Sequence, residues 1–158
     1  MDTAKKQGRY SRIIEQLSGL LTKTDNDIAR MATIAAVLSN KFEYFFWCGF
    51  YFVNDNKMLV GPYQGPVACQ VLEGGGVCIA AVKQNASIVV PDVHKFPGHI
   101  ACDSRSLSEI VVPVRDASGT IRAVLDVDSI SLASFDETDR INLEIITQMV
   151  YNTAIAKV

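Results

Sequence analysis

The residues of this chain whose types allow covalent chemistry are its four cysteines, Cys48, Cys69, Cys78 and Cys102. Cys102 stands out because the bend-forming pair Pro97-Gly98, followed by His99, comes just before it. A cysteine is nucleophilic only as a thiolate, which a neighbouring positive charge or oriented backbone N–H groups favour. His99 and the loop amides could supply both, so Cys102 is a candidate nucleophile. Taken alone, the pair also fits a small apolar filler beside a satisfied surface histidine.

The cysteines form no local redox or zinc motif. No two of them are separated by only two residues, as a thioredoxin-like or zinc-knuckle pair would require. Any partnership among them must therefore be tertiary. A zinc site made from His94, His99, Cys78 and Cys102 matches no standard ligand spacing, and we do not expect one.

Three carboxylates form a second group of candidates, namely Glu109, Asp126 and Asp128. Asp126 and Asp128 alternate along a predicted strand and so share one face roughly 7 Å apart, and Glu109 begins the neighbouring strand. Acids at the mouth of an apolar sheet need a cation, a proton or donors, which makes a ligand ammonium a natural partner. If they share a pocket with Cys102, we expect one to be protonated and able to act as an acid. The alternative is that they cap turns in solvent.

Trp47 and Tyr51 are four residues apart on a predicted strand and share a face, about 13 Å from end to end. They could enclose a small apolar ligand, although an aromatic core stripe would have the same spacing. Gly74-Gly75-Gly76 matches no phosphate-binding fingerprint, and we interpret it as a flexible hinge beside Cys78.

Helices are expected at both ends of the chain, where apolar residues recur at helical spacing. The first covers residues 9–21, and the second begins at an N-cap signal at Thr24 and reaches about Asn40. A final helix is expected to begin at Ser134, with an apolar stripe that consists of Ile141, Ile145, Met149 and Ala156.

The middle of the chain reads mainly as strands. β-favouring runs predict strands over residues 42–53, 58–60, 67–72, 87–90, 108–114 and 120–127, with a short helix over 77–83. Residues 91–106 form a long irregular segment containing both histidines, and loops of that length are usually functional or disordered. The order predicts one α+β domain over residues 1–158, with a mainly antiparallel sheet and terminal helices packed on it.

The composition excludes several classes of function. The 158 residues are 49% hydrophobic and carry a net charge of −2, so no electrostatic field favours nucleic acid or an anionic membrane. Neither a secretory signal nor a membrane-spanning run is apparent, which predicts a cytoplasmic protein with reduced thiols. We expect no cofactor and no metal. A homodimer is compatible with the sequence, which does not define the oligomeric state.

Several strings together resemble one family. They are Trp47-x-Gly49-Phe50-Tyr51, GPYQG at 61–65, Gly76-Val77-Cys78, PGHIACD at 97–103, SEIVVP at 108–113 and Asp126-Val127-Asp128. In this pattern the chain is similar to free methionine-(R)-sulfoxide reductases, which are built on a GAF-type domain. The likeness extends from Trp47 to the final helix, and the strings at 97–103 and 108–113 are its most specific parts.

The resemblance implies reduction of free L-methionine-(R)-S-oxide, with thioredoxin as the external reductant. It implies that Cys102 attacks the sulfoxide sulfur and that Cys78 and Cys69 resolve the product through a disulfide. It further implies that Glu109, Asp126 and Asp128 hold the substrate ammonium and transfer protons, while Trp47 and Tyr51 enclose the methyl-sulfur end. Cys48 has no implied role.

Two other functions fit parts of the same sequence. A non-catalytic GAF-type sensor would bind a small molecule and keep its cysteines buried. A cysteine hydrolase would use Cys102 with His99 and would be indifferent to Cys78. Turnover with free methionine sulfoxide separates the reductase from the sensor. Stalling of Cys78→Ser after roughly one turnover is expected of the reductase and not of the hydrolase.

Overall fold

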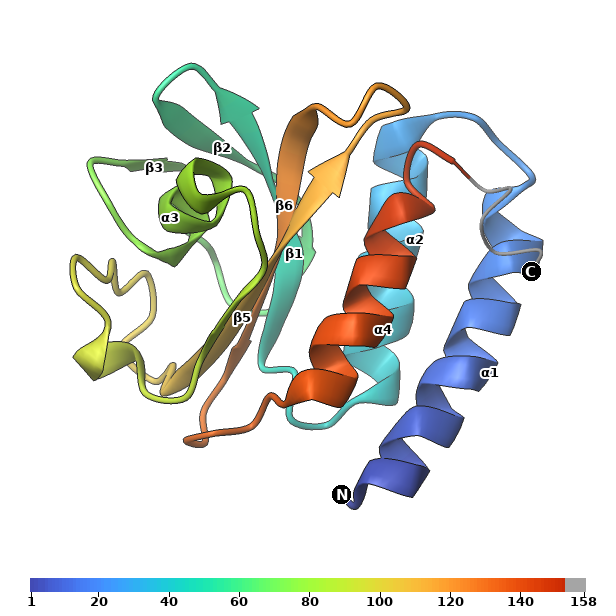
Figure 1. The fold of residues 1–158 in the computed structure, drawn as a ribbon, viewed down its shortest axis with the longest axis horizontal. Helices are drawn as coiled ribbons and strands as arrows, with labels where there is room; N and C mark the ends of the chain where they lie inside the picture. The colour runs from blue at the N-terminus through green and yellow to red at the C-terminus, as the bar shows by residue number, and fades with distance from the viewer. Residues whose placement is uncertain (153–158) are drawn as a thin grey trace.

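In the computed structural model, which describes residues 1–152, six strands form one antiparallel sheet in the order β3-β2-β1-β6-β5-β4 (Figure 1). The strands are β1 (Trp47–Asn54), β2 (Lys57–Gln64), β3 (Val71–Glu73), β4 (Ile88–Val90), β5 (Ser108–Arg115) and β6 (Ile121–Ser129). β1, β6 and β5 lie at the centre, where their runs of apolar and β-branched residues are buried on both faces.

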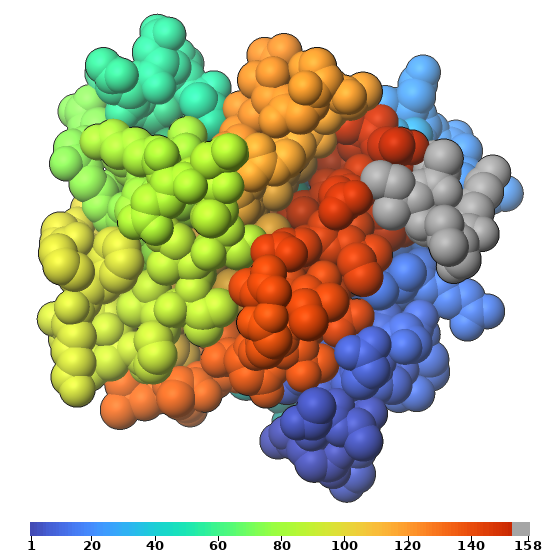
Figure 2. Space-filling model, viewed as in Figure 1, coloured from blue at the N-terminus to red at the C-terminus, as the bar shows by residue number. Residues whose placement is uncertain are grey.

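Two helices, α2 (Asp27–Lys41) and α4 (Glu137–Gln148), cover one face of the sheet, and α1 (Thr3–Leu21) packs on the outer side of both (Figure 1). The short helix α3 (Val77–Gln84), the 3₁₀ turn η1 (Val93–Lys95) and the loops around them cover the other face. In Figure 2, α3 and the 91–106 loop, coloured lime to yellow, lie on the side of the molecule opposite α1 and α4. The predicted α+β domain with terminal helices on an antiparallel sheet is confirmed.

Alternation along the central strands sends neighbouring residues into two separate cores. On β5, Ile110 and Val112 pack under the three helices, whereas Val111 belongs to the second core beneath α3. Cys48 faces the helix side and is fully buried there, far from the candidate cysteines on the opposite face. This placement keeps Cys48 away from the reactive face of the sheet.

Several predicted boundaries were wrong, for local reasons. The first strand begins at Trp47 rather than at residue 42, because residues 42–46 form a turn that packs aromatic rings beside α1. The strand predicted over 67–72 shrinks to Val71–Glu73, and residues 65–70 form a loop after Gly65, whose φ of +127° suits glycine. The second helix takes Asn26 as its N-cap, whose side chain accepts from the Ala29 N–H.

The apolar stripe predicted for the last helix is confirmed at Met149, which is fully buried, and is wrong at Ile141. Ile141 is 46% exposed, while Leu143 and Ile146 are fully buried in the helix-side core. The N-cap is Asp136, which forms a capping box with Asp139. Ala156 lies outside the described residues. No helix among residues 1–152 is long and apolar enough to cross a membrane.

Candidate active site

A pocket opens on the α3 side of the sheet and collects every site residue that the sequence singled out except Cys69, which borders it through its disulfide. Its floor comes from β1, β5 and β6, and its walls come from the 65–70 loop, the start of α3 and the 96–106 loop. Its lining includes Trp47, Tyr51, Cys78, His99, Cys102, Glu109, Asp126 and Asp128.

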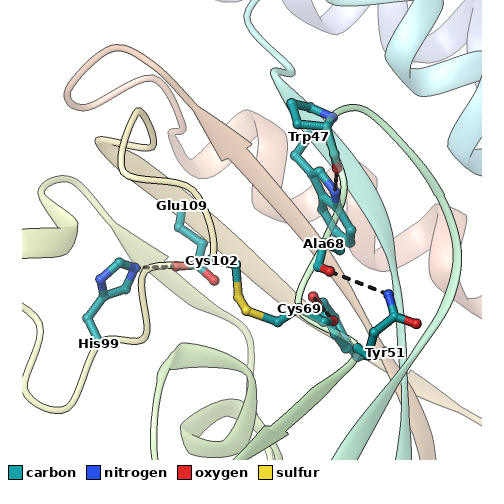
Figure 3. The surroundings of a disulfide bond; sticks show 9 residues. Trp47, Tyr51, Ala68, Cys69, His99, Cys102 and Glu109 are labelled. Carbon is teal, nitrogen blue, oxygen red and sulfur yellow. Dashed lines mark hydrogen bonds and ion pairs between the residues drawn. A yellow bond between two sulfur atoms is a disulfide. The ribbon is translucent and has the colours of Figure 1, made fainter.

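A disulfide joins Cys69 to Cys102 at the solvent-facing mouth of this pocket (Figure 3). The two Cα atoms are 5.4 Å apart, and 33 residues separate them in sequence. Cys102 is exposed and Cys69 is half-buried. The bond joins the loop between β2 and β3 to the loop that follows η1. The tertiary partnership expected among the cysteines therefore forms, and it pairs Cys102 with Cys69.

Cys78 remains a free thiol at the base of the pocket. It is the second residue of α3, which begins after Gly76, and only 3% of it is exposed. Burial, followed by the charges of Asp126 and Glu109, raises the pKa of Cys78 well above its usual range. The pocket thus holds Cys78 as a neutral thiol. Gly76 has a φ of +95°, so the glycine segment shapes the turn into α3.

The three carboxylates meet on one face because of the strand register. Glu109 on β5 lies directly opposite Asp128 on β6, and Asp126 is paired across the other strand boundary with Gly49. Gly49 has no side chain, and the Trp47 ring occupies the place that a side chain there would take. Glu109 and Asp126 are only 5% and 6% exposed, and Asp128 is half-buried.

Burial is the main cause of the raised pKa values in this group. It raises the pKa of Asp126 to about 6, and hydrogen bonds from Glu109 and Cys78 keep it from rising further. Burial and the neighbouring Asp126 charge raise the pKa of Glu109 well above its usual range. Burial likewise raises the pKa of Asp128, where a hydrogen bond from Ser106 acts in the opposite direction. These shifts favour the protonated form of Glu109, whose hydrogen bond Asp126 accepts.

His99 faces the carboxylates. Its Nε2 atom lies 3.6 Å from Oε2 of Glu109, with 14% of the His99 side chain exposed (Figure 3). Burial, together with His94, lowers the pKa of His99, so the ring is neutral at physiological pH. His94 points elsewhere, to Asp92, and is exposed. Hence the structure does not assemble the zinc set of histidines with Cys102.

Trp47 and Tyr51 form one aromatic wall of the pocket. Their ring centroids are 5.7 Å apart, much closer than the extended strand suggested, because the Trp47 ring lies over Gly49. The wall also holds the neighbouring loop: Trp47 Nε1–H donates to the Pro66 carbonyl at 3.1 Å, and Tyr51 O–H donates to the Cys69 carbonyl at 3.2 Å. These aromatic residues therefore position the loop that carries Cys69.

Sequence reasoning missed two contributors to the site. Tyr63 stacks on Trp47 with ring centroids 5.2 Å apart and extends the aromatic wall. Ser106 is buried in the pocket lining and hydrogen bonds to Asp128. Tyr63 lies in the resembling string at 61–65, a signal that could have identified it, whereas nothing local distinguishes Ser106.

Comparison with known proteins gives consistent relatives, although no protein-family model matches the chain. GAF domain-containing protein A of Dictyostelium discoideum is 47% identical over 149 residues, which is 93% of each chain. The free methionine-R-sulfoxide reductase of Escherichia coli is 37% identical over 131 residues, covering 82% of this chain and 79% of that protein. The free methionine-R-sulfoxide reductase of Neisseria meningitidis, solved in complex with its substrate, superimposes with a TM-score of 0.89 at 38% identity, covering 99% and 92% of the two chains.

Proposed function

The chain belongs to the free methionine-R-sulfoxide reductase family of GAF-type domains, and we propose on that premise that it reduces free L-methionine-(R)-S-oxide to L-methionine. The observation that carries the proposal is the Cys69–Cys102 disulfide at the mouth of a pocket that contains three carboxylates and two stacked aromatic rings. A disulfide in that position is the expected oxidised product of such a reaction.

We propose that Cys102 is the attacking thiolate. Attack on the sulfoxide sulfur, with protonation of the oxygen, releases methionine and leaves a sulfenic acid on Cys102. The Cys69 thiol then displaces water from this sulfenic acid and forms the disulfide. Because Cys69 is the partner in the structure, it is the first resolving thiol in this scheme. Cys78 is a second thiol, and the start of α3 would have to move before it could reach Cys102.

Glu109 is well suited to donate a proton to the sulfoxide oxygen, because burial and the Asp126 charge raise its pKa and favour its acid form. Asp126, with a pKa of about 6, supplies negative charge for the α-ammonium of the substrate, and Asp128 on the same face of β6 would ionise as the ammonium binds. A methionine sulfoxide within a peptide lacks that ammonium, which accounts for a preference for the free amino acid. The Trp47 and Tyr51 rings offer an apolar surface for the methyl-sulfur end.

Regeneration requires a dithiol that reduces the Cys69–Cys102 disulfide, and we propose thioredoxin for this step. The exposure of Cys102 supports access by such a protein. A cycle that depends on reduced thiols also fits the cytoplasm, which we propose as the location. This scheme treats the GAF-like domain over residues 1–158 as the catalytic unit.

The decisive experiment is NADPH oxidation coupled through thioredoxin reductase and thioredoxin. We expect turnover with free methionine-R-sulfoxide and little with the S epimer or with a peptide-bound R-sulfoxide. Cys102→Ser is the matched inactive control. Absence of turnover with every sulfoxide would overturn the proposal and favour a non-catalytic sensor.

A further inference from the structure

Three potential metal ligands meet at the base of the pocket from three different elements. The Sγ atom of Cys78 on α3, a carboxylate oxygen of Glu109 on β5 and one of Asp126 on β6 all lie within 4.8 Å of one another, and all three residues are buried. A tetrahedral zinc ion with ordinary Zn–S and Zn–O bonds would place such ligand atoms about 3.4–3.6 Å apart. Small side-chain rotations are enough to close that difference.

A second observation points to a missing ligand. Within the described part of the chain, Oδ1 of Asp126 is a buried side-chain oxygen without a hydrogen-bond partner. Only 6% of Asp126 is exposed. Buried polar atoms are almost always satisfied, so an unpaired carboxylate oxygen that lines a pocket needs an explanation. Cys78, Glu109 and Asp126 all line the pocket, which gives an ion access to the three side chains.

The charges around the site favour a cation as the missing ligand. No Lys or Arg side chain of residues 1–152 forms an ion pair with Glu109, Asp126 or Asp128, and the one basic neighbour is the His99 ring. One thiolate with two carboxylates suits the borderline-soft Zn²⁺ better than Mg²⁺ or Ca²⁺, which prefer oxygen ligands throughout.

We propose that Cys78, Glu109 and Asp126 form a binding site for Zn²⁺, which would occupy the base of the pocket and exclude the sulfoxide substrate. Binding replaces the Cys78 S–H and Glu109 O–H bonds by bonds to the metal and releases two protons to solvent. Three protein ligands leave the fourth position for water on the pocket side. The inhibitory consequence rests on the proposed function, whereas metal binding does not.

The oxidised protein offers a clean test of binding. With Cys69 and Cys102 in their disulfide and Cys48 fully buried on the other side of the sheet, Cys78 is the remaining thiol that a metal can reach. We expect isothermal titration to show one Zn²⁺ per chain, and Co²⁺ substitution to show a thiolate-to-cobalt charge-transfer band. Cys78→Ser and Asp126→Asn should each weaken Zn²⁺ binding by about tenfold or more.

His94→Ala is the matched control, because His94 is an exposed potential ligand outside this site and should leave the affinity unchanged. Circular dichroism is used to check that each variant is folded. If Cys78→Ser does not fold, the nearly isosteric Asp126→Asn still tests the site. No Zn²⁺ binding to the oxidised wild type, or equal binding by wild type and both site variants, would overturn the proposed site.

Inhibition is then measured separately, as loss of thioredoxin-coupled turnover on adding Zn²⁺ and recovery on adding a chelator. Zinc that binds at this site without lowering turnover would overturn the inhibitory part of the proposal. A protein that binds zinc as described but turns over no sulfoxide would instead overturn the proposed function and leave the metal site intact.

Discussion

At the residue scale, Cys69 and Cys78 both lie on the pocket side of the sheet but have different surroundings. Cys69 lies on a loop and is joined to the exposed Cys102. Cys78, in contrast, is only 3% exposed and hydrogen bonds to Asp126. A neutral buried thiol is a poor partner for a sulfenic acid at the pocket mouth. Their surroundings therefore suit Cys69 to a resolving role and Cys78 to the role of a buried ligand or proton donor.

The first prediction compares Cys69→Ser with Cys78→Ser. We expect Cys69→Ser to release methionine in a single turnover and then stall under thioredoxin-coupled conditions, because its sulfenic acid lacks the adjacent resolving thiol. Cys78→Ser should continue to turn over, which revises the stall expected from the sequence, because Cys69 and not Cys78 is joined to Cys102. Rapid-quench measurement of methionine, with Cys48→Ala as a control on the far side of the sheet, tests this. Stalling of Cys78→Ser together with continued turnover by Cys69→Ser would contradict it.

The second prediction concerns the cost of burying Asp126. Its pKa of about 6 in the fold exceeds the value near 3.9 expected in the unfolded chain. The folded state therefore holds a proton that the unfolded chain releases, and the free energy of unfolding falls as pH rises through about 4 to 6. Asp126→Asn removes this cost, so we expect a gain of about 2–3 kcal/mol at pH 7.

Urea unfolding of the oxidised wild type and of Asp126→Asn, at about pH 4 and at pH 7, measures the gain. Near pH 4 the wild-type carboxyl is protonated in the folded state and about half protonated in the unfolded chain, so the gain from the substitution should largely vanish there. A stability change of equal size at both pH values would show that it does not come from ionisation. The same variant should lose sulfoxide turnover, because the pocket no longer carries the Asp126 charge.

At the element scale, the close approach of β1 and β2 organises the aromatic wall. A Cβ atom added at Gly49 would lie 2.2 Å from Cβ of Tyr63 and 2.7 Å from the Trp47 ring. Cβ atoms do not approach one another at that distance, so only glycine allows the Trp47 ring to lie between Tyr63 and Tyr51. The wall in turn holds the loop that carries Cys69 through the Pro66 and Cys69 carbonyls.

The third prediction is that Gly49→Ala raises KM and slows disulfide formation while the core under the three helices persists. The reason is that Trp47 must move, which disrupts both the apolar wall and the loop. Steady-state kinetics and thiol titration after one turnover report the two effects. Gly19→Ala is the matched control, since its added Cβ meets nothing within 4 Å on exposed α1 and should leave both quantities unchanged. Unchanged kinetics in Gly49→Ala would contradict the role of the wall.

At the scale of the whole molecule, the sheet separates a helix-side core from the reactive side. The large fully buried residues gather under α1, α2 and α4, whereas the pocket side combines a smaller core with long loops. The Cys69–Cys102 disulfide joins two of those loops, and its cysteines are 33 residues apart in the sequence. Redox change can therefore alter the loops around the pocket while the sheet and its three helices stay folded.

The fourth prediction follows from this division. Reduction of the disulfide should lower the free energy of unfolding by about 3–4 kcal/mol through loop-closure entropy, without unfolding the protein. Hydrogen exchange should increase over residues 65–70 and 96–106 and change little in β5 and β6. Equal increases in the central strands would show instead that the disulfide supports the whole fold.

The sequence by itself determined the α+β class, the antiparallel sheet and the set of candidate residues, because periodicity and specific strings are local properties. Only the tertiary structure decided that Cys102 pairs with Cys69 while Cys78 stays buried, that His99 faces Glu109, and that Ile141 is exposed. Those outcomes depend on strand register, on the loop after Gly65 and on which helix face meets the sheet. Each of these is set by packing between segments far apart in the chain, which no local pattern records.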